Sequence, residues 1–135
     1  MVSLIIYLIR CNERVILLNV LPKADEAVIS IDKLTGYALD PMKGRDKSIA
    51  FREALGYDKS NADLLINEIK NNLKRFPAKQ KENKGYVDTY EVLMELVGVN
   101  GKVANVMTSW LDDKLTGEMR LTSVYVKKRK GESHD

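Results

Sequence analysis

The sequence is poor in the residues that most enzymes use for nucleophilic and metal chemistry. Its 135 residues include one cysteine, Cys11, and one histidine, His134. A single cysteine cannot form an intramolecular disulfide, so we expect a reducing, cytoplasmic setting. His134 lies in a charged tail, which argues against Ser-His-Asp catalysis and histidine-ligated zinc. Phosphate-binding glycine loops, a calcium loop and paired His/Cys spacings are also missing, so we expect neither a metal nor a cofactor.

Long apolar runs are scarce as well. Residues 1–20 contain two short ones, 4–9 and 15–18, separated by a polar segment that carries three charges. Because a helix needs about 20 consecutive apolar residues to cross a membrane, we expect no membrane span. A basic flank and a small-residue cleavage site, which mark a secretory signal, are missing. The segment is interpreted either as a hairpin packed on the core or as an extension before a domain that begins near Leu21.

The composition is that of a single ordinary domain. With 44% hydrophobic and 30% charged residues, the chain can bury one core, which we place in residues 21–126, followed by a charged flexible tail, 127–135. The net charge of +3 is a weak argument for an anionic partner. The cations gather, however, in the tail and in residues 70–84, and such runs are either solvated surface or a docking surface.

Turn and capping signals divide the first half of the domain into short elements. A β-branched run predicts a strand at 27–31, and Asp32 then caps a helical turn that Asp40-Pro41 ends. A polar loop, 40–47, leads into a helix at 46–55 closed by Gly56. A second helix, 62–76, ends before Pro77, and residues 78–85 are expected to form an exposed basic loop.

The second half predicts a meander of three antiparallel strands. Residues 89–96 alternate between apolar and polar, and Asn100-Gly101 predicts a tight hairpin into a strand at 102–111. A longer connection, 112–117, leads to a third strand, 118–126. Helices followed by strands indicate an α+β fold, with two main helices packed on a mainly antiparallel sheet that ends in this meander.

Strand alternation selects the candidate site residues. Thr108 and Trp110 share one face of their strand, and Arg120 and Thr122 share one face of the next. Cross-strand neighbours lie about 5 Å apart, so Thr108, Arg120 and Thr122 are expected on one surface, with Tyr125 on the other unless a bulge re-aims it. These residues are also good strand formers, and a lone tryptophan is often a core residue, so a purely structural interpretation stays open.

Several blocks of sequence carry a family resemblance. They are residues 21–24 (Leu-Pro-Lys-Ala), 33–41, 47 and 51, 54–57, 106–110 and 116–126. In this order they resemble a bacterial domain-of-unknown-function family that occurs as the C-terminal tip of polymorphic toxins, of the contact-dependent-inhibition and Rhs types, and as stand-alone proteins. The order of elements is similar to that of the barnase/EndoU/colicin/RelE ribonucleases.

The resemblance implies metal-independent cleavage of RNA, with transfer RNA among the candidate substrates. In such enzymes a base takes the 2′-hydroxyl proton, cations stabilise the phosphorane, and an acid protonates the leaving oxygen. Because no core histidine is present, the identity of the base stays open. The roles assigned by hypothesis are phosphate contact or base for Lys43 and Lys47, phosphorane stabilisation for Arg120, phosphate positioning for Thr108 and Thr122, acid or base stacking for Tyr125, and RNA binding for Lys70, Lys74 and Trp110.

A non-catalytic binding module with the same fold is the alternative hypothesis. In that case the basic segment 70–84 would dock an acidic partner, such as a small immunity-type protein. The two hypotheses differ in outcome: the alternative predicts a stable acidic partner and no cleavage of RNA.

Overall fold

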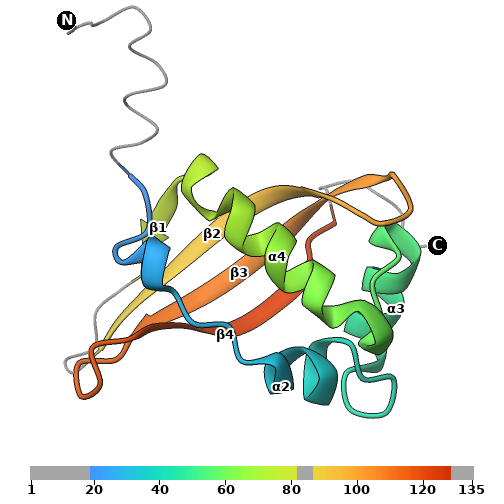
Figure 1. Ribbon diagram of the computed structural model, residues 1–135, viewed down its shortest axis with the longest axis horizontal. Helices are drawn as coiled ribbons and strands as arrows, with labels where there is room; N and C mark the ends of the chain where they lie inside the picture. The colour runs from blue at the N-terminus through green and yellow to red at the C-terminus, as the bar shows by residue number, and fades with distance from the viewer. Residues whose placement is uncertain (1–18, 82–86, 129–135) are drawn as a thin grey trace, which may run out of the picture.

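The computed structural model describes residues 19–81 and 87–128 (Figure 1). The expected N-terminal hairpin, most of the charged tail, Cys11 and His134 lie outside these residues. Within them, a four-stranded antiparallel sheet has the order β1-β2-β3-β4. Its strands are β1 (Ala78–Gln80), β2 (Asp88–Val97), β3 (Val103–Asp112) and β4 (Met119–Val126). No helix of the described ranges is long and apolar enough to span a membrane.

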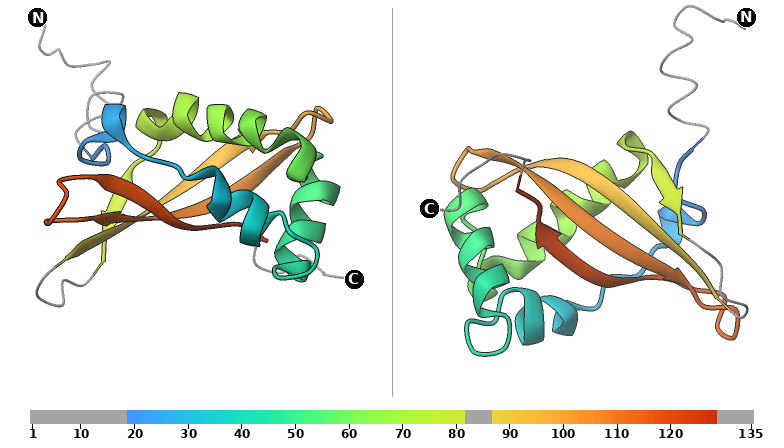
Figure 2. Two further views of the ribbon diagram at one scale, coloured as in Figure 1. Left: turned by 60° about the horizontal axis from the view of Figure 1, so that its bottom comes forward. Right: turned by 180° about the vertical axis from the view of Figure 1, so that it is seen from behind.

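The helices pack on one face of this sheet. They comprise η1 (Ala24–Glu26), α2 (Ile31–Lys33), the π-helical turn η2 (Leu34–Ala38), α3 (Arg45–Leu55), η3 (Lys59–Asn61), α4 (Ala62–Asn72) and η4 (Leu73–Arg75). Helix α4 crosses the sheet, whereas α2, η2 and α3 lie at one end beside β4 (Figures 1 and 2). Leu65 and Ile69 of α4 and Leu73 of η4 are buried in one core with Val92 and Met94 of β2. The α+β fold predicted from the sequence is confirmed.

Two predicted local structures are wrong. Residues 27–31 form no strand: Val28 makes a single parallel bridge to Arg120, and Ser30 then caps α2 through a hydrogen bond from the Asp32 amide (3.3 Å). Residues 78–80 form edge strand β1 instead of a loop, an arrangement compatible with Lys79 because lysine is tolerated at sheet edges. The second predicted helix, 62–76, forms as α4 followed directly by the η4 turn, which ends at Arg75, one residue before the predicted end.

The hairpin between β2 and β3 forms where Asn100-Gly101 predicts it, but with a longer loop. Of these two residues only Gly101 has a positive φ (84°), so the two-residue turn is absent. The Gly101 amide donates to the Gly98 carbonyl (3.0 Å), and the Gly98 amide donates to the Lys102 carbonyl (2.8 Å). This is a type of three-residue connection in which a turn is followed by a left-handed glycine.

A charged network closes the opposite end of the sheet from α3. The buried Asp112 carboxylate accepts hydrogen bonds from Lys23 Nζ (2.9 Å) and Lys114 Nζ (3.0 Å), and Lys114 also pairs with Asp88 (3.2 Å). The bond from Lys23, followed by that from Lys114, holds the pKa of Asp112 below its usual range, although burial opposes the shift. The bonds that Lys114 makes, first to Asp112 and then to Asp88, raise the pKa of Lys114.

Replacing Asp112 with asparagine should lower the free energy of unfolding at pH 7 by about 1–3 kcal/mol, toward the lower end because both lysines are partly exposed. The pKa of Asp112 in the folded state lies below the unfolded value of about 3.9. The ionised carboxylate therefore contributes fully to the free energy of unfolding above about pH 5, and this contribution is lost as pH falls through the folded-state pKa. The free energy of unfolding of wild type, measured by urea denaturation, should therefore fall more between pH 5 and pH 3 than that of D112N. Equal slopes would contradict this, and Asp25→Asn, at an exposed ion pair with Lys74, is the matched control.

Candidate functional site

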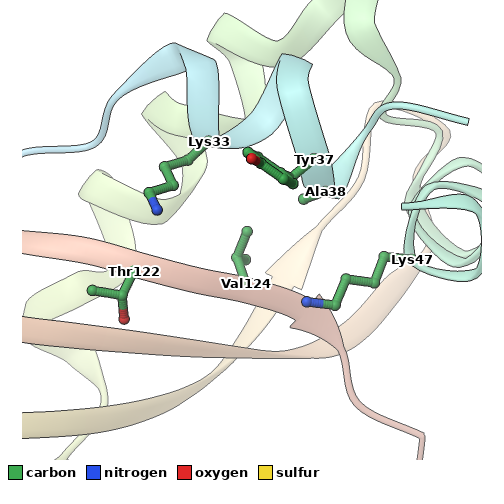
Figure 3. Close-up of a pocket in the computed structure, with 6 residues that line it drawn as sticks. All are labelled: Lys33, Tyr37, Ala38, Lys47, Thr122 and Val124. Atoms are coloured by element: carbon green, nitrogen blue, oxygen red, sulfur yellow. The ribbon is translucent and has the colours of Figure 1, made fainter. Parts of the chain in front are cut away.

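An open cleft lies between β4 and the helical layer at its end. It has a volume of about 180 Å³ and is lined by six residues, Lys33, Tyr37, Ala38, Lys47, Thr122 and Val124 (Figure 3). We call it the β4 cleft. Its side chains come from the α2–η2 segment, from α3 and from β4, so three parts of the chain meet there.

The π-helical turn η2 presents the first group of these residues. Leu34 and Ala38 are buried and fix the turn on the core, while the Leu39 amide donates to the Leu34 carbonyl (2.7 Å) five residues back. The turn leaves Tyr37 59% exposed, and Figure 3 shows its hydroxyl end directed toward Lys33. Single π turns are rare and occur frequently at functional sites.

A close backbone contact positions the lysines of the next segment. A Cβ on Gly44 would lie 2.2 Å from the Tyr37 carbonyl oxygen, so only glycine allows this loop to approach the turn so closely. The approach places Lys43 Nζ 5.7 Å from the centre of the Tyr37 ring. In the first turn of α3, Lys47 Nζ lies 5.7 Å from the centre of the Tyr125 ring. Both distances are within the range of cation–π attraction.

A β-bulge shapes the strand side of the cleft. Trp110 pairs with Leu121 but Ser109 pairs with Ser123, so Thr122 is an extra residue in β4. The bulge lets Leu121 and the residue three positions later, Val124, both reach the core, and it leaves Thr122 exposed with its hydroxyl donating to the Ser109 carbonyl (3.2 Å). Bulges are frequent beside active sites, because they re-aim side chains.

The structure brings together four of the residues selected from the sequence. Lys47 and Thr122 line the β4 cleft, Tyr125 lies next to Lys47, and Lys43 lies next to Tyr37. Lys33 and Tyr37 were missed as site residues. Their spacing of four on a helical segment and the aromatic ring beside Gly36 were the available signals, but the exposure of that ring depends on the π turn.

The remaining candidates lie elsewhere. The expected common surface of Thr108, Arg120 and Thr122 is wrong, because Thr108 faces the core with 0% exposure. Its hydroxyl donates to the Val92 carbonyl and accepts a bond from Trp110 Nε1, both at 2.8 Å, and Trp110 is itself 0% exposed.

Arg120, near the start of β4, forms an ion pair with Asp113. Its Nη1 donates to Asp113 Oδ2 (2.8 Å) in the connection between β3 and β4, and it is not among the residues that line the cleft. The pKa of Asp113 is lowered first by the bond from the Leu115 amide and to a lesser extent by Arg120. Lys70 and Lys74 lie at the end of α4 and in η4, outside the cleft, and Lys74 is paired with Asp25.

The lining can hold an anion. Its polar groups are two ammonium groups and two hydroxyls, and none of its six residues is acidic. Ammonium groups attract phosphate and carboxylate but repel metal ions. In the described ranges no group of three or more His, Cys, Asp or Glu side chains is arranged to hold a metal.

Comparison with known proteins gives one match. The family model described as Domain of unknown function (DUF6883) matches residues 20–128, which include all the helices and strands described above. No curated protein and no solved structure shows significant similarity to the chain.

Proposed function

The chain belongs to the DUF6883 family, and we propose that its domain binds RNA in the β4 cleft and cleaves it without a metal by attack of the 2′-hydroxyl. The proposal rests on the meeting of Lys33, Lys47 and Thr122 around one open, acid-free cleft. Figure 3 shows the two lysines reaching toward β4 from different elements, with the threonine on the strand itself. A phosphodiester gains negative charge on its oxygens as it is attacked, so fixed cations lower the barrier.

The reaction assigns a role to each side chain. The 2′-oxygen attacks phosphorus and the bond to the 5′-oxygen breaks, which gives a 2′,3′-cyclic phosphate and a 5′-hydroxyl end. Lys47 accepts the 2′-hydroxyl proton, and Lys33 stabilises the phosphorane. The Thr122 hydroxyl positions the phosphate, and Tyr125, beside Lys47, gives a proton to the leaving 5′-oxygen. Arg120 and Thr108 have no part in this assignment, because Arg120 is bonded to Asp113 and Thr108 is buried in the core.

Purified protein should cleave total RNA or transfer RNA in EDTA, and Lys47→Ala should slow cleavage about 10²- to 10⁴-fold, the usual effect of losing a general base. Gel analysis of the fragments measures the rate, and detection of their cyclic phosphate ends identifies the reaction.

Lys102→Ala is the matched control, since it removes the same charge from an exposed position in the β2–β3 loop. Cleavage that needs an added metal, or that survives in Lys47→Ala, would contradict the mechanism. If the activity is present, we further propose that cytoplasmic RNA is the target, as for a toxin domain, and that expression in bacteria arrests growth.

The alternative, a binding module that docks an acidic protein on residues 70–84, has less support from the geometry. Of the cations described in that segment, Lys74 pairs with Asp25 and Lys81 with Glu91 (3.6 Å), and Arg75 donates to Asn72 (2.6 Å). These contacts reduce the charge available to a partner. Capture of a stable acidic protein together with an absence of RNA cleavage would favour it.

A further inference from the structure

The exposed Tyr37 ring at the mouth of the β4 cleft carries a further inference, which rests on the proposed function. We propose that the RNA is single-stranded where it binds and that one unpaired base stacks on Tyr37 while its phosphate lies between Lys33 and Lys47. Among the described residues, Tyr37 is the only aromatic one with a largely exposed side chain. The inference therefore concerns the class of RNA that the cleft accepts.

The exposure of Tyr37 is imposed by its local structure. Leu34 and Ala38 of the same turn are buried and occupy the core side of the turn. The loop at Gly44 packs closely against the Tyr37 carbonyl, and the ring is directed to the surface. By contrast, Tyr57 is buried, and its hydroxyl donates to the Val97 carbonyl (2.9 Å). Tyr57 thus has a packing role, whereas the Tyr37 ring is held outward.

The surroundings of the ring fit a nucleotide. Lys43 lies 5.7 Å from the ring centre, and Lys33 and Lys47 line the same cleft as Tyr37. Proteins that bind single strands combine such cations with aromatic rings, and each stacked base contributes about 1–3 kcal/mol.

A duplex cannot use this arrangement. In an A-form helix each base is stacked between its neighbours and paired, so its flat face cannot reach a protein ring. Unpaired bases in loops and single strands can turn outward and stack. The pairing of one exposed ring with two phosphate-binding lysines therefore selects unpaired RNA.

Fluorescence anisotropy with a labelled 2′-O-methyl oligoribonucleotide, which cannot be cleaved by 2′-hydroxyl attack, tests the inference. The single strand should bind at least tenfold more tightly than the same strand annealed to its complement. Tyr37→Ala should weaken single-strand binding about 5- to 100-fold, whereas Tyr37→Phe and Tyr37→Trp should retain it, because stacking needs a ring and not a hydroxyl. Met42→Ala, at an 89% exposed position in the next loop, is the control and should have no effect.

The outcomes separate this inference from the proposed function. If the oligonucleotide binds and Lys47→Ala weakens binding but Tyr37→Ala does not, only the stacking inference is overturned. Equal affinity for single strand and duplex, or a Tyr37→Phe variant as weak as Tyr37→Ala, also overturns it. If neither form of RNA binds, the proposed function and this inference are both overturned. Circular dichroism of each variant shows whether the fold is kept.

Discussion

Replacing Trp110 with alanine should lower the free energy of unfolding by about 3–5 kcal/mol, the usual range for emptying the site of a buried large aromatic residue. Trp110 is fully buried in the core, and its Nε1 donates to the buried Thr108 hydroxyl (2.8 Å). The substitution therefore leaves a cavity and also removes a donor from a buried acceptor. Because domains of this kind are stable by about 5–15 kcal/mol, the loss should be plain in urea denaturation followed by circular dichroism.

Ser109→Ala provides the control, because Ser109 is the preceding residue, is only partly buried and alternates to the opposite face of β3; its effect should stay within about 0.5 kcal/mol. Trp110 is the one tryptophan of the sequence, so its fluorescence reports on this site alone. Added RNA should neither quench nor shift that emission. Strong quenching by RNA would contradict the core assignment and indicate that Trp110 contacts RNA. A Trp110→Ala variant that is stable but no longer binds RNA would indicate the same.

The fold was largely predictable because its signals are local. The alternation in residues 89–96 identifies the buried side of β2, where Val92, Met94 and Leu96 are all fully buried. Gly56, with φ of 80°, closes α3 at the predicted residue. Each of these signals concerns residues close in sequence, so strand faces and helix ends can be read without knowledge of the tertiary structure.

The site was less predictable because it depends on register between distant segments. Alternation alone places Arg120 and Thr122 on one face, and it gives no sign that Thr122 is an extra residue opposite Ser109. The bulge allows Leu121 and Val124 both to pack in the core, where they join buried residues of the helices. The error at Thr108 has a similar origin, since its hydroxyl is satisfied within the sheet by Val92.

The helical side of the cleft was also difficult to predict from the sequence. The sequence 33–39 predicts a helical turn, but it does not predict the π-helical bond from the Leu39 amide to the Leu34 carbonyl. That bond and the contact at Gly44 decide that Tyr37 points outward. Lys47 was found because it lies in the first turn of a predicted helix after a polar loop, whereas no signal near Lys33 in the sequence shows that it faces β4.

Replacing Gly98 with alanine should lower the free energy of unfolding by about 3 kcal/mol or more, because the new methyl group has no space. A Cβ at this position would lie 2.1 Å from the Leu55 carbonyl oxygen and 2.5 Å from the Leu55 Cα, and neither backbone atom can rotate away. Leu55 is the buried last residue of α3, so either the helix end or the hairpin must move. The movement would strain two adjacent bonds of Val97, whose amide donates to Glu68 and whose carbonyl accepts from Tyr57, each at 2.9 Å.

Gly36→Ala is the matched control, since a Cβ there meets no atom within 4 Å and the position is helical. It should leave the free energy of unfolding unchanged or raise it by up to about 1 kcal/mol, because alanine loses less backbone entropy than glycine on folding. Thermal denaturation of the two variants beside wild type compares one added methyl group in a closed and an open position. A G98A protein as stable as G36A would mean that the β2–β3 hairpin does not rest on the end of α3. In that case the helix that carries Lys47 would be held at the β4 cleft by its contacts with β4, β3 and η2.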